Sequence, residues 1–153
     1  HYAGQGDVCL ELFCGVGAMT LPLTQAFKKV VAVEVSEEAI AALNRAVSQV
    51  PADSVQVELA DAYAVTGDLL RDTGAKTLVA DPPRRGLGEA LIQAIDASNV
   101  ERLVFLSCQP AVLERDLTLL EKAGFRLSAL SIVDQFPGTV HVETVALLER
   151  NQD

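Results

Sequence analysis

The chain has 153 residues, of which 50% are hydrophobic and 22% are charged, and we expect residues 1–153 to form a single soluble domain. Apolar runs too short to span a bilayer and only three cysteines predict a cytoplasmic protein with reduced thiols and no membrane partner. The formal net charge of −9 argues against this domain gripping nucleic acid alone, because phosphate binding requires clustered Lys and Arg.

Strands and helices are predicted to alternate along the chain. In order, we expect a strand at 8–13, a helix at 17–27, a strand at 29–35, a helix at 36–50, a strand at 55–60, a helix at 63–71, a strand at 77–80, a helix at 87–97, a strand at 102–107, a helix at 111–123, and strands at 125–134 and 141–149. Strands separated by helices indicate an α/β fold with a mainly parallel sheet and helices on both faces. The two final strands indicate a C-terminal antiparallel hairpin.

Residues that follow the first three strands predict a nucleoside-cofactor site. Gly15 and Gly17 would let the backbone of the first loop approach a ligand closely. Glu34 could accept hydrogen bonds from both ribose hydroxyls, and Asp61 is suited to an adenine edge. Solvated carboxylates without a binding role remain the alternative for both acids. Ligands of such sheets bind at the carboxyl ends of the strands, which is where these residues are expected.

This pattern serves both NAD and S-adenosylmethionine. NAD requires a pyrophosphate site at a helix N-terminus, and its fingerprint would have a third glycine near position 20, where Thr20 stands. S-adenosylmethionine carries a sulfonium and no phosphate, so an acidic first loop suits it. We place Glu11 in that loop, and the sequence therefore favours S-adenosylmethionine.

Three later segments are expected to share one rim of the sheet: DPPRRG at 81–86, SCQP at 107–110 and FPGTVHVE at 136–143. Pro110 is typical of the first turn of a helix, which places Cys108 just before a helix start. The helix dipole favours a thiolate at such a position. A buried, unreactive thiol is the alternative reading of Cys108.

These segments, together with LFCGVG at 12–17, resemble the RNA uracil-5-methyltransferases that act on ribosomal or transfer RNA. The resemblance covers most of the chain and implies a Rossmann-like class I methyltransferase fold with a seven-stranded sheet. It also implies a covalent mechanism with Cys108 as nucleophile and Glu143 as general base. The cofactor site implied by the resemblance contains Phe13, Glu34, Asp61 and Asp81.

The chain departs from the family pattern in three places. Ala18 stands where members often carry Asn. Members also commonly contact the cofactor through a glutamine upstream of the first strand, at a position that this chain starts too late to contain. The N-terminal RNA-binding and central domains of larger members are not in this sequence either. We therefore expect a fragment, the catalytic domain of a longer protein whose other domains largely grip the RNA. This expectation agrees with the acidity of the chain.

The chemistry of uracil methylation needs the two groups that the sequence offers. Carbon 5 of uracil is a poor nucleophile, and addition of a thiolate to carbon 6 turns the ring into an enolate that can attack a methyl sulfonium. A base must then remove the proton on carbon 5. Arg84, Arg85 and His141 are candidate substrate-binding residues, with surface ion pairs as the alternative for the arginines. No His/Cys cluster has metal-ligand spacing, so we expect no metal.

Three functional hypotheses follow. The first is a uridine methyltransferase, with 23S ribosomal RNA favoured over transfer RNA. The second is another S-adenosylmethionine-dependent methyltransferase, such as an amino-methylating enzyme, although those place an aromatic residue where Arg84 stands. The third is a non-catalytic Rossmann-like binding module, which would not require Cys108 and Glu143 together.

Overall fold

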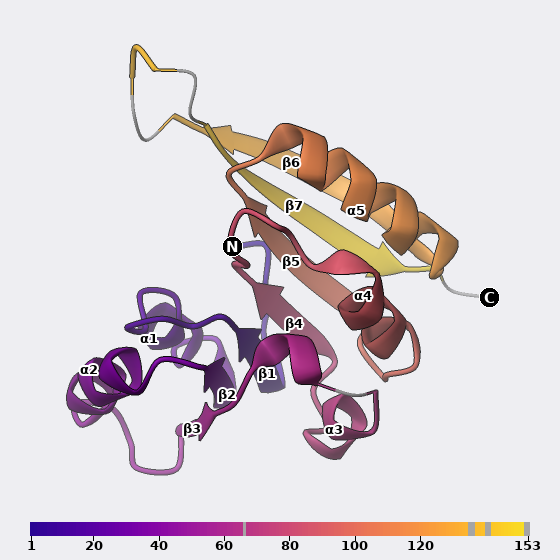
Figure 1. Ribbon diagram of the computed structural model, residues 1–153. Coiled ribbons are helices and arrows are strands. Elements are labelled where there is room, and N and C mark those ends of the chain that lie inside the picture. The colour runs from indigo at the N-terminus through magenta and orange to yellow at the C-terminus, as the bar shows by residue number, and fades with distance from the viewer. Residues whose placement is uncertain (66, 135–136, 140–141, 152–153) are drawn as a thin grey trace.

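The computed structural model describes residues 1–65, 67–134, 137–139 and 142–151. Within these ranges the chain forms a seven-stranded sheet in the order β3-β2-β1-β4-β5-β7-β6 (Figure 1). The strands are β1 (Gly6–Leu12), β2 (Phe27–Glu34), β3 (Val55–Leu59), β4 (Thr77–Ala80), β5 (Arg102–Ser107), β6 (Phe125–Val133) and β7 (Glu143–Arg150). The helices are α1 (Thr20–Leu23), α2 (Glu37–Val47), the 3₁₀ turn η1 (Ala62–Ala64), α3 (Gly67–Asp72), α4 (Gly88–Asp96) and α5 (Pro110–Lys122).

Strand direction brings distant parts of the chain to one edge of the sheet. Strands β1 to β5 pair in parallel, so their carboxyl ends lie at the same edge. Strand β7 runs antiparallel to both β5 and β6, which places its amino end at that same edge. The predicted mainly parallel seven-stranded sheet with a C-terminal antiparallel hairpin is confirmed.

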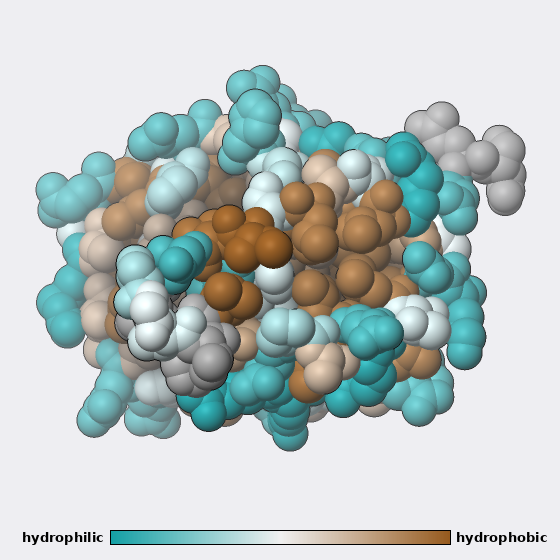
Figure 2. All heavy atoms as spheres, turned by 90° about the horizontal axis from the view of Figure 1, so that it is seen from above, coloured by the Kyte–Doolittle hydropathy of each residue, from teal (hydrophilic) through white to brown (hydrophobic). Residues whose placement is uncertain are grey.

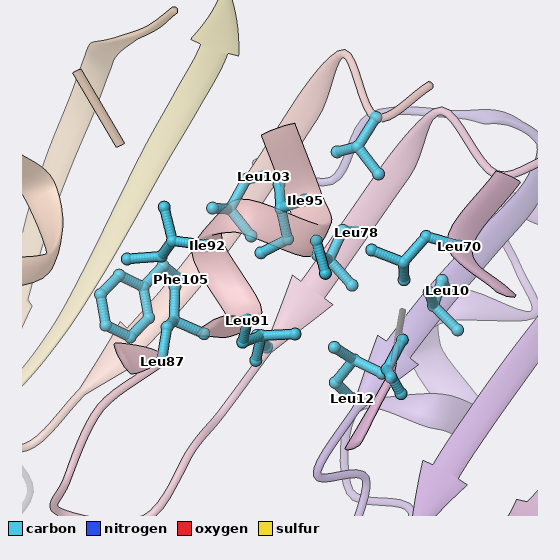
Figure 3. Close-up of a cluster of buried hydrophobic side chains, with 14 of the residues drawn as sticks. Leu10, Leu12, Leu70, Leu78, Leu87, Leu91, Ile92, Ile95, Leu103 and Phe105 are labelled. Atoms are coloured by element: carbon cyan, nitrogen blue, oxygen red, sulfur yellow. The ribbon is translucent and has the colours of Figure 1, made fainter. Parts of the chain in front are cut away.

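The larger hydrophobic core lies between the sheet and helices α3, α4 and α5. Figure 3 shows Leu78 and Phe105 from the central strands facing Leu91 and Ile95 from α4, and all four side chains are at most 1% exposed. Each such side chain contributes about 1.5–3 kcal/mol of hydrophobic stabilisation when it is fully buried. This packing fixes the strands whose ends carry the predicted site.

The opposite face of the sheet is covered by α1 and α2. Leu23 of α1 packs against Cys9 and Phe27, and Leu43 of α2 packs against Cys14. Burial raises the pKa of both the Cys9 and Cys14 thiols to about 12, so they remain protonated at neutral pH. Both cysteines are therefore packing residues, as the sequence indicates.

Two helices differ from the prediction. The expected helix at 17–27 is a single turn at Thr20–Leu23, because Gly17 has a φ of 93° and Phe27 already belongs to β2, paired with Gly6. The expected helix at 63–71 is divided into η1 and α3. Both changes occur in connections between strands and leave the order of the strands unaltered.

Apolar residues are also found on the outer surface. Figure 2 shows hydrophobic residues gathered on the face seen from above, surrounded by hydrophilic ones. Strand β6 contributes four exposed large apolar side chains, at Leu127, Leu130, Ile132 and Val133. Among the described residues, no helix is both long enough and apolar enough to cross a membrane.

Candidate active site at the carboxyl edge of the sheet

The loop after β1 has an unusual backbone. Phe13 has a φ of 63°, in the left-handed region that residues with a side chain seldom adopt, and Gly15 and Gly17 have φ values of 55° and 93°. The loop is tied to the neighbouring strand because the Cys14 amide donates to the Val33 carbonyl at 3.1 Å. A Cβ on Gly17 would lie 2.4 Å from a side-chain carbon of Leu43, so this close approach requires glycine.

Glu34 anchors this loop to the end of β2. Its carboxylate accepts hydrogen bonds from the amides of Gly15, Val35 and Ser36 at 2.8–2.9 Å. A carboxylate offers about four acceptor positions, so capacity remains for a ligand hydroxyl. Glu34 therefore has a structural role that the sequence did not predict, as an acceptor for three backbone amides, and it also lines the cavity described next.

A cavity of about 270 Å³ lies at the ends of β1, β2 and β3. Its wall includes three predicted cofactor residues, Phe13, Glu34 and Asp61. The rest of the wall is formed by Val33, Val35, Ala60, Ala62, Tyr63, Pro83 and Arg85. The size is near the lower end for small-molecule sites, and a mostly apolar wall with a few carboxylates suits a nucleoside.

Asp61 also has a local structural role. Its side chain accepts a hydrogen bond from the Tyr63 amide at 2.9 Å and so caps η1. The Tyr63 ring packs against Phe13, with the ring centroids 4.9 Å apart. Sequence reasoning did not single out Tyr63, and its position two residues after Asp61 is the one signal that could have indicated it.

The prediction that Glu11 lies in the first loop is wrong, since Glu11 belongs to β1 and is fully buried. Its Oε2 accepts a hydrogen bond from the Thr20 hydroxyl at 2.6 Å, and its Oε1 has no hydrogen-bond partner among the described residues. Burial raises the pKa of Glu11 to about 7, and the negative charge of Asp81 adds to this effect. Glu11 does not line the nucleoside cavity.

Cys108 lies on a braced turn between β5 and α5. It is half-buried and immediately precedes Gln109, the N-cap of α5, whose first residue is Pro110 as the sequence predicts. The Ser107 hydroxyl accepts a hydrogen bond from the Gln109 amide at 3.2 Å. Cys108 therefore lies directly before the N-terminus of a 13-residue helix.

The pairing of β5 with β7 brings Glu143 to the edge of the sheet where β5 ends. Ser107 pairs with Thr144, and the Thr144 hydroxyl donates to the Ser107 carbonyl at 2.7 Å. Cys108 follows Ser107 directly and Glu143 precedes Thr144 directly, so both residues flank the last pair of this ladder. Glu143 is half-buried.

Asp81 directly follows β4 at the same edge of the sheet and is exposed. Desolvation raises the pKa of Asp81, and the negative charge of Glu143 raises it further. Asp81 is not part of the wall of the nucleoside cavity. The predicted site residues therefore form two groups: Phe13, Glu34 and Asp61 around the cavity, and Asp81, Cys108 and Glu143 on the adjacent stretch of the rim.

The predicted substrate residues have different positions. Arg84 and Arg85 are both exposed, and Arg85 also lines the nucleoside cavity with its guanidinium 3.3 Å from the centroid of the Tyr63 ring. His141 lies outside the described residues. Within the ranges that the structure describes, no group of three or more His, Cys, Asp or Glu side chains could hold a metal ion.

A larger cavity, of about 1120 Å³, lies at the amino ends of the strands and includes none of the predicted site residues. Its wall contains charged side chains that pair with each other. Arg102 contacts Glu149 at 3.0 Å, and Lys76 contacts Glu101 at 2.6 Å. Ligands of parallel sheets bind at the opposite edge, so this cavity is not the candidate active site.

Comparison with known proteins connects this geometry with one family. The family model described as tRNA (Uracil-5-)-methyltransferase matches residues 2–151. The chain belongs to this family. The resemblance that the sequence motifs indicate is thereby confirmed, and members of the RNA uracil-5-methyltransferase family depend on S-adenosylmethionine.

The curated relatives are RNA methyltransferases that are longer than this chain. The chain is 40% identical over 152 residues to the 23S rRNA (uracil(1939)-C(5))-methyltransferase of Pseudomonas fluorescens, covering 94% of this chain and 31% of the relative. It is 38% identical over 144 residues to an uncharacterised RNA methyltransferase of Bacillus cereus, covering 94% of this chain and 31% of that protein. The chain therefore spans about a third of the length of these curated relatives.

Solved structures support the same fold. The Pyrococcus abyssi tRNA (uracil-54, C5)-methyltransferase, solved in complex with S-adenosyl-L-homocysteine, superposes with a TM-score of 0.82 at 29% identity, covering 95% of this chain and 35% of that one. A putative S-adenosylmethionine-dependent methyltransferase from Listeria monocytogenes superposes with a TM-score of 0.78 at 10% identity, covering 99% of this chain and 93% of that one. The latter shows the fold alone, and together they confirm the predicted class I methyltransferase architecture.

Proposed function

We propose that this chain is a catalytic domain that transfers a methyl group from S-adenosylmethionine to carbon 5 of a uridine in RNA. The observation that carries the proposal is that Cys108, directly after β5, and Glu143, the first residue of β7, belong to the same edge of the sheet as the nucleoside cavity. Membership of the uracil-5-methyltransferase family supports it.

The residues around the small cavity suit the adenosine part of the cofactor. Glu34 has acceptor capacity for the ribose hydroxyls, and Asp61 can accept from an adenine amino group. Phe13 supplies an apolar wall, while Gly15 and Gly17 allow the loop to approach closely. In this proposal Asp81 would meet the remainder of the cofactor, and the bound cofactor supplies an electrophilic methyl group.

In the proposed mechanism the Cys108 thiolate adds to carbon 6 of the uracil, and the electrons of the carbon 5–carbon 6 double bond move to form an enolate. Carbon 5 of the enolate attacks the methyl group that the bound cofactor would supply, and S-adenosylhomocysteine would be released as the bond between the methyl carbon and the sulfonium breaks. Glu143 then removes the proton that remains on carbon 5, the carbon 6–sulfur bond breaks, and the double bond and the thiolate are restored. The half-buried Cys108 before the N-terminus of α5 and the Glu143 carboxylate at the start of β7 fit these two roles.

We propose 23S ribosomal RNA as the substrate, with transfer RNA as the alternative. The 40% identity to the Pseudomonas fluorescens enzyme favours ribosomal RNA, whereas the Pyrococcus abyssi neighbour is a tRNA methyltransferase. Because the chain carries a net charge of −9, most of the RNA grip would come from other parts of the protein. Arg84 and His141 are proposed contacts to the target nucleotide, and we keep a cytoplasmic location as a prediction.

A covalent trap tests the proposal. The protein that contains this chain is incubated with S-adenosylmethionine and with 23S rRNA or tRNA fragments carrying 5-fluorouridine. Fluorine cannot leave as a proton, so we expect an adduct that survives denaturing electrophoresis and maps to Cys108. An adduct that persists in Cys108→Ser, or no adduct with protein that binds the cofactor, would refute the mechanism.

A second variant isolates the proposed base. Glu143→Gln should accumulate the methylated adduct with ordinary uridine, because the carbon 5 proton is no longer removed. Normal turnover in Glu143→Gln would remove Glu143 from that role. Comparison of methyl transfer to 23S rRNA and to tRNA decides between the two substrates.

A further inference from the structure

Tyr63 connects the nucleoside cavity to the loop between β4 and α4. The Tyr63 amide donates a hydrogen bond to the Asp61 carboxylate at 2.9 Å. The Tyr63 hydroxyl, at the far end of the side chain, donates to the Gly86 carbonyl at 2.7 Å. Its ring contacts Phe13 in between. The ring is therefore fixed at both ends and forms part of the cavity wall.

The side chain of Arg85 covers this ring. Its guanidinium carbon lies 3.3 Å from the Tyr63 centroid, which is stacking contact. Arg85 lines the same cavity as Glu34 and Asp61, the two carboxylates proposed to hold the nucleoside. Its guanidinium therefore lies at the wall of the proposed cofactor site.

The backbone under Arg85 is held from helix α5. The Arg85 carbonyl accepts from the Arg115 guanidinium at 2.8 Å, and the Leu87 amide donates to the Asp116 carboxylate at 2.7 Å. Asp116 is fully buried, and Arg115 donates to its other oxygen at 2.7 Å. Because both flanks are bonded, the loop presents the Arg85 side chain to Tyr63 from a fixed position.

We propose that Arg85 is a cofactor-positioning residue that, stacked on Tyr63, completes the outer wall of the adenosine cavity. This inference rests on the proposed function, since it assigns Arg85 to the cofactor rather than to the RNA substrate. The planar guanidinium is the feature required, because a lysine ammonium carries the same charge without a flat surface for stacking. Arg84, one residue earlier and exposed, remains free to face the RNA.

Binding measurements on four proteins test the assignment: the wild type, Arg85→Ala, Arg85→Lys and Arg84→Ala. Isothermal titration with S-adenosyl-L-homocysteine and with adenosine gives the affinity of the cavity, and RNA binding at several salt concentrations gives the number of phosphate contacts. Arg85→Ala should weaken the binding of both small ligands by about two- to fivefold, the range expected for loss of a cation–π contact at an exposed position. Arg85→Lys should recover little of this loss. Arg84→Ala should bind both small ligands like the wild type.

The opposite pattern would overturn the inference. If Arg85→Ala binds S-adenosyl-L-homocysteine like the wild type and lowers the salt dependence of RNA binding, Arg85 is an RNA contact. Wild-type affinity in Arg85→Lys would show that charge, and not stacking, is what the cavity needs, and would also refute the proposal. Arg85→Lys keeps the test available should Arg85→Ala fail to fold. A wild-type protein that binds neither small ligand refutes the proposed function itself, which is a separate outcome.

Discussion

Replacement of Glu11 by glutamine should make the stability of the protein less sensitive to pH. Glu11 is 0% exposed, and one of its oxygens has no hydrogen-bond partner in the described part of the chain. Burial is the main cause that raises its pKa from 4.5 to about 7, with a smaller contribution from the charge of Asp81. The fold therefore holds this side chain in its neutral form across a pH range in which an unfolded chain would ionise it.

The direction of the effect follows from proton linkage. Between pH 4.5 and about pH 7 the folded protein binds one more proton at Glu11 than the unfolded chain does, so the free energy of unfolding falls as the pH rises. A rise in pKa from 4.5 to about 7 corresponds to a loss of about 3 kcal/mol over this window. Glutamine cannot ionise, and it retains an oxygen that can accept from the Thr20 hydroxyl.

Urea unfolding followed by circular dichroism at a series of pH values measures this effect. The difference in free energy of unfolding between Glu11→Gln and the wild type should shift in favour of the variant by about 3 kcal/mol between pH 4.5 and pH 8. Glu121→Gln, at an exposed position of α5, serves as the control and should show a nearly constant difference. A constant difference for Glu11→Gln as well would mean that Glu11 is ionised in the fold, and the argument from burial would be wrong.

Three further predictions concern the loops that carry the site, and the same urea unfolding measures them. Gly86→Ala should lower the free energy of unfolding by about 3 kcal/mol, because φ is 77° and the new Cβ would lie 2.3 Å from a carboxylate oxygen of Asp116. Gly88→Ala, with a φ of 75° and open space around the new Cβ, should lower it by about 1 kcal/mol. Equal losses would contradict the steric argument. Gly17→Ala should cost about 1 kcal/mol more than Gly15→Ala, since a leucine side chain of α2 lies 2.4 Å from the new Cβ only at the former position. Asp116→Asn should lower the free energy of unfolding by about 2 kcal/mol, because the buried side chain no longer offers a carboxylate to the Leu87 amide and to the half-exposed Arg115 guanidinium, and an unchanged unfolding midpoint would exclude that role.

The central strands could be predicted from sequence because they are short apolar runs with a clear end, such as β2, which ends at Glu34, and β4, which is followed by Asp81 and two prolines. Placement of the site followed from strand direction, since Glu34, Asp61 and Cys108 each come just after such a run. The first helix could not be predicted to be so short, because the competition for Phe27 between a helix and β2 is settled by pairing with Gly6. The pattern of apolar residues around Phe27 contains no information about its pairing with a residue of another strand.

The residues that sequence reasoning missed act through contacts between distant segments. The hydroxyl of Tyr63 reaches a carbonyl 23 positions away, and the carboxylate of Asp116 reaches an amide 29 positions away. Neither contact has a periodic or spacing signature. The burial of Glu11 was missed for a related reason: an acid at the end of an apolar run reads as the start of a loop, and only Thr20 from α1 shows why it can remain inside.

The antiparallel strand at the end of the chain explains how the proposed nucleophile and base can meet. In a fully parallel sheet the start of a seventh strand would lie at the amino edge, about the length of a strand away from Cys108. Reversal of β7 brings its first residue, Glu143, to the carboxyl edge, and the pairing of Ser107 with Thr144 sets the register. A slip of one residue would turn the side chains of β7 to the other face, exposing the buried Ala146 and Leu148 and turning Glu143 away. The same apolar contacts that close the core therefore fix the position of Glu143 at the edge where Cys108 follows β5, which is why the proposed chemistry depends on the hairpin register as much as on the two reacting side chains.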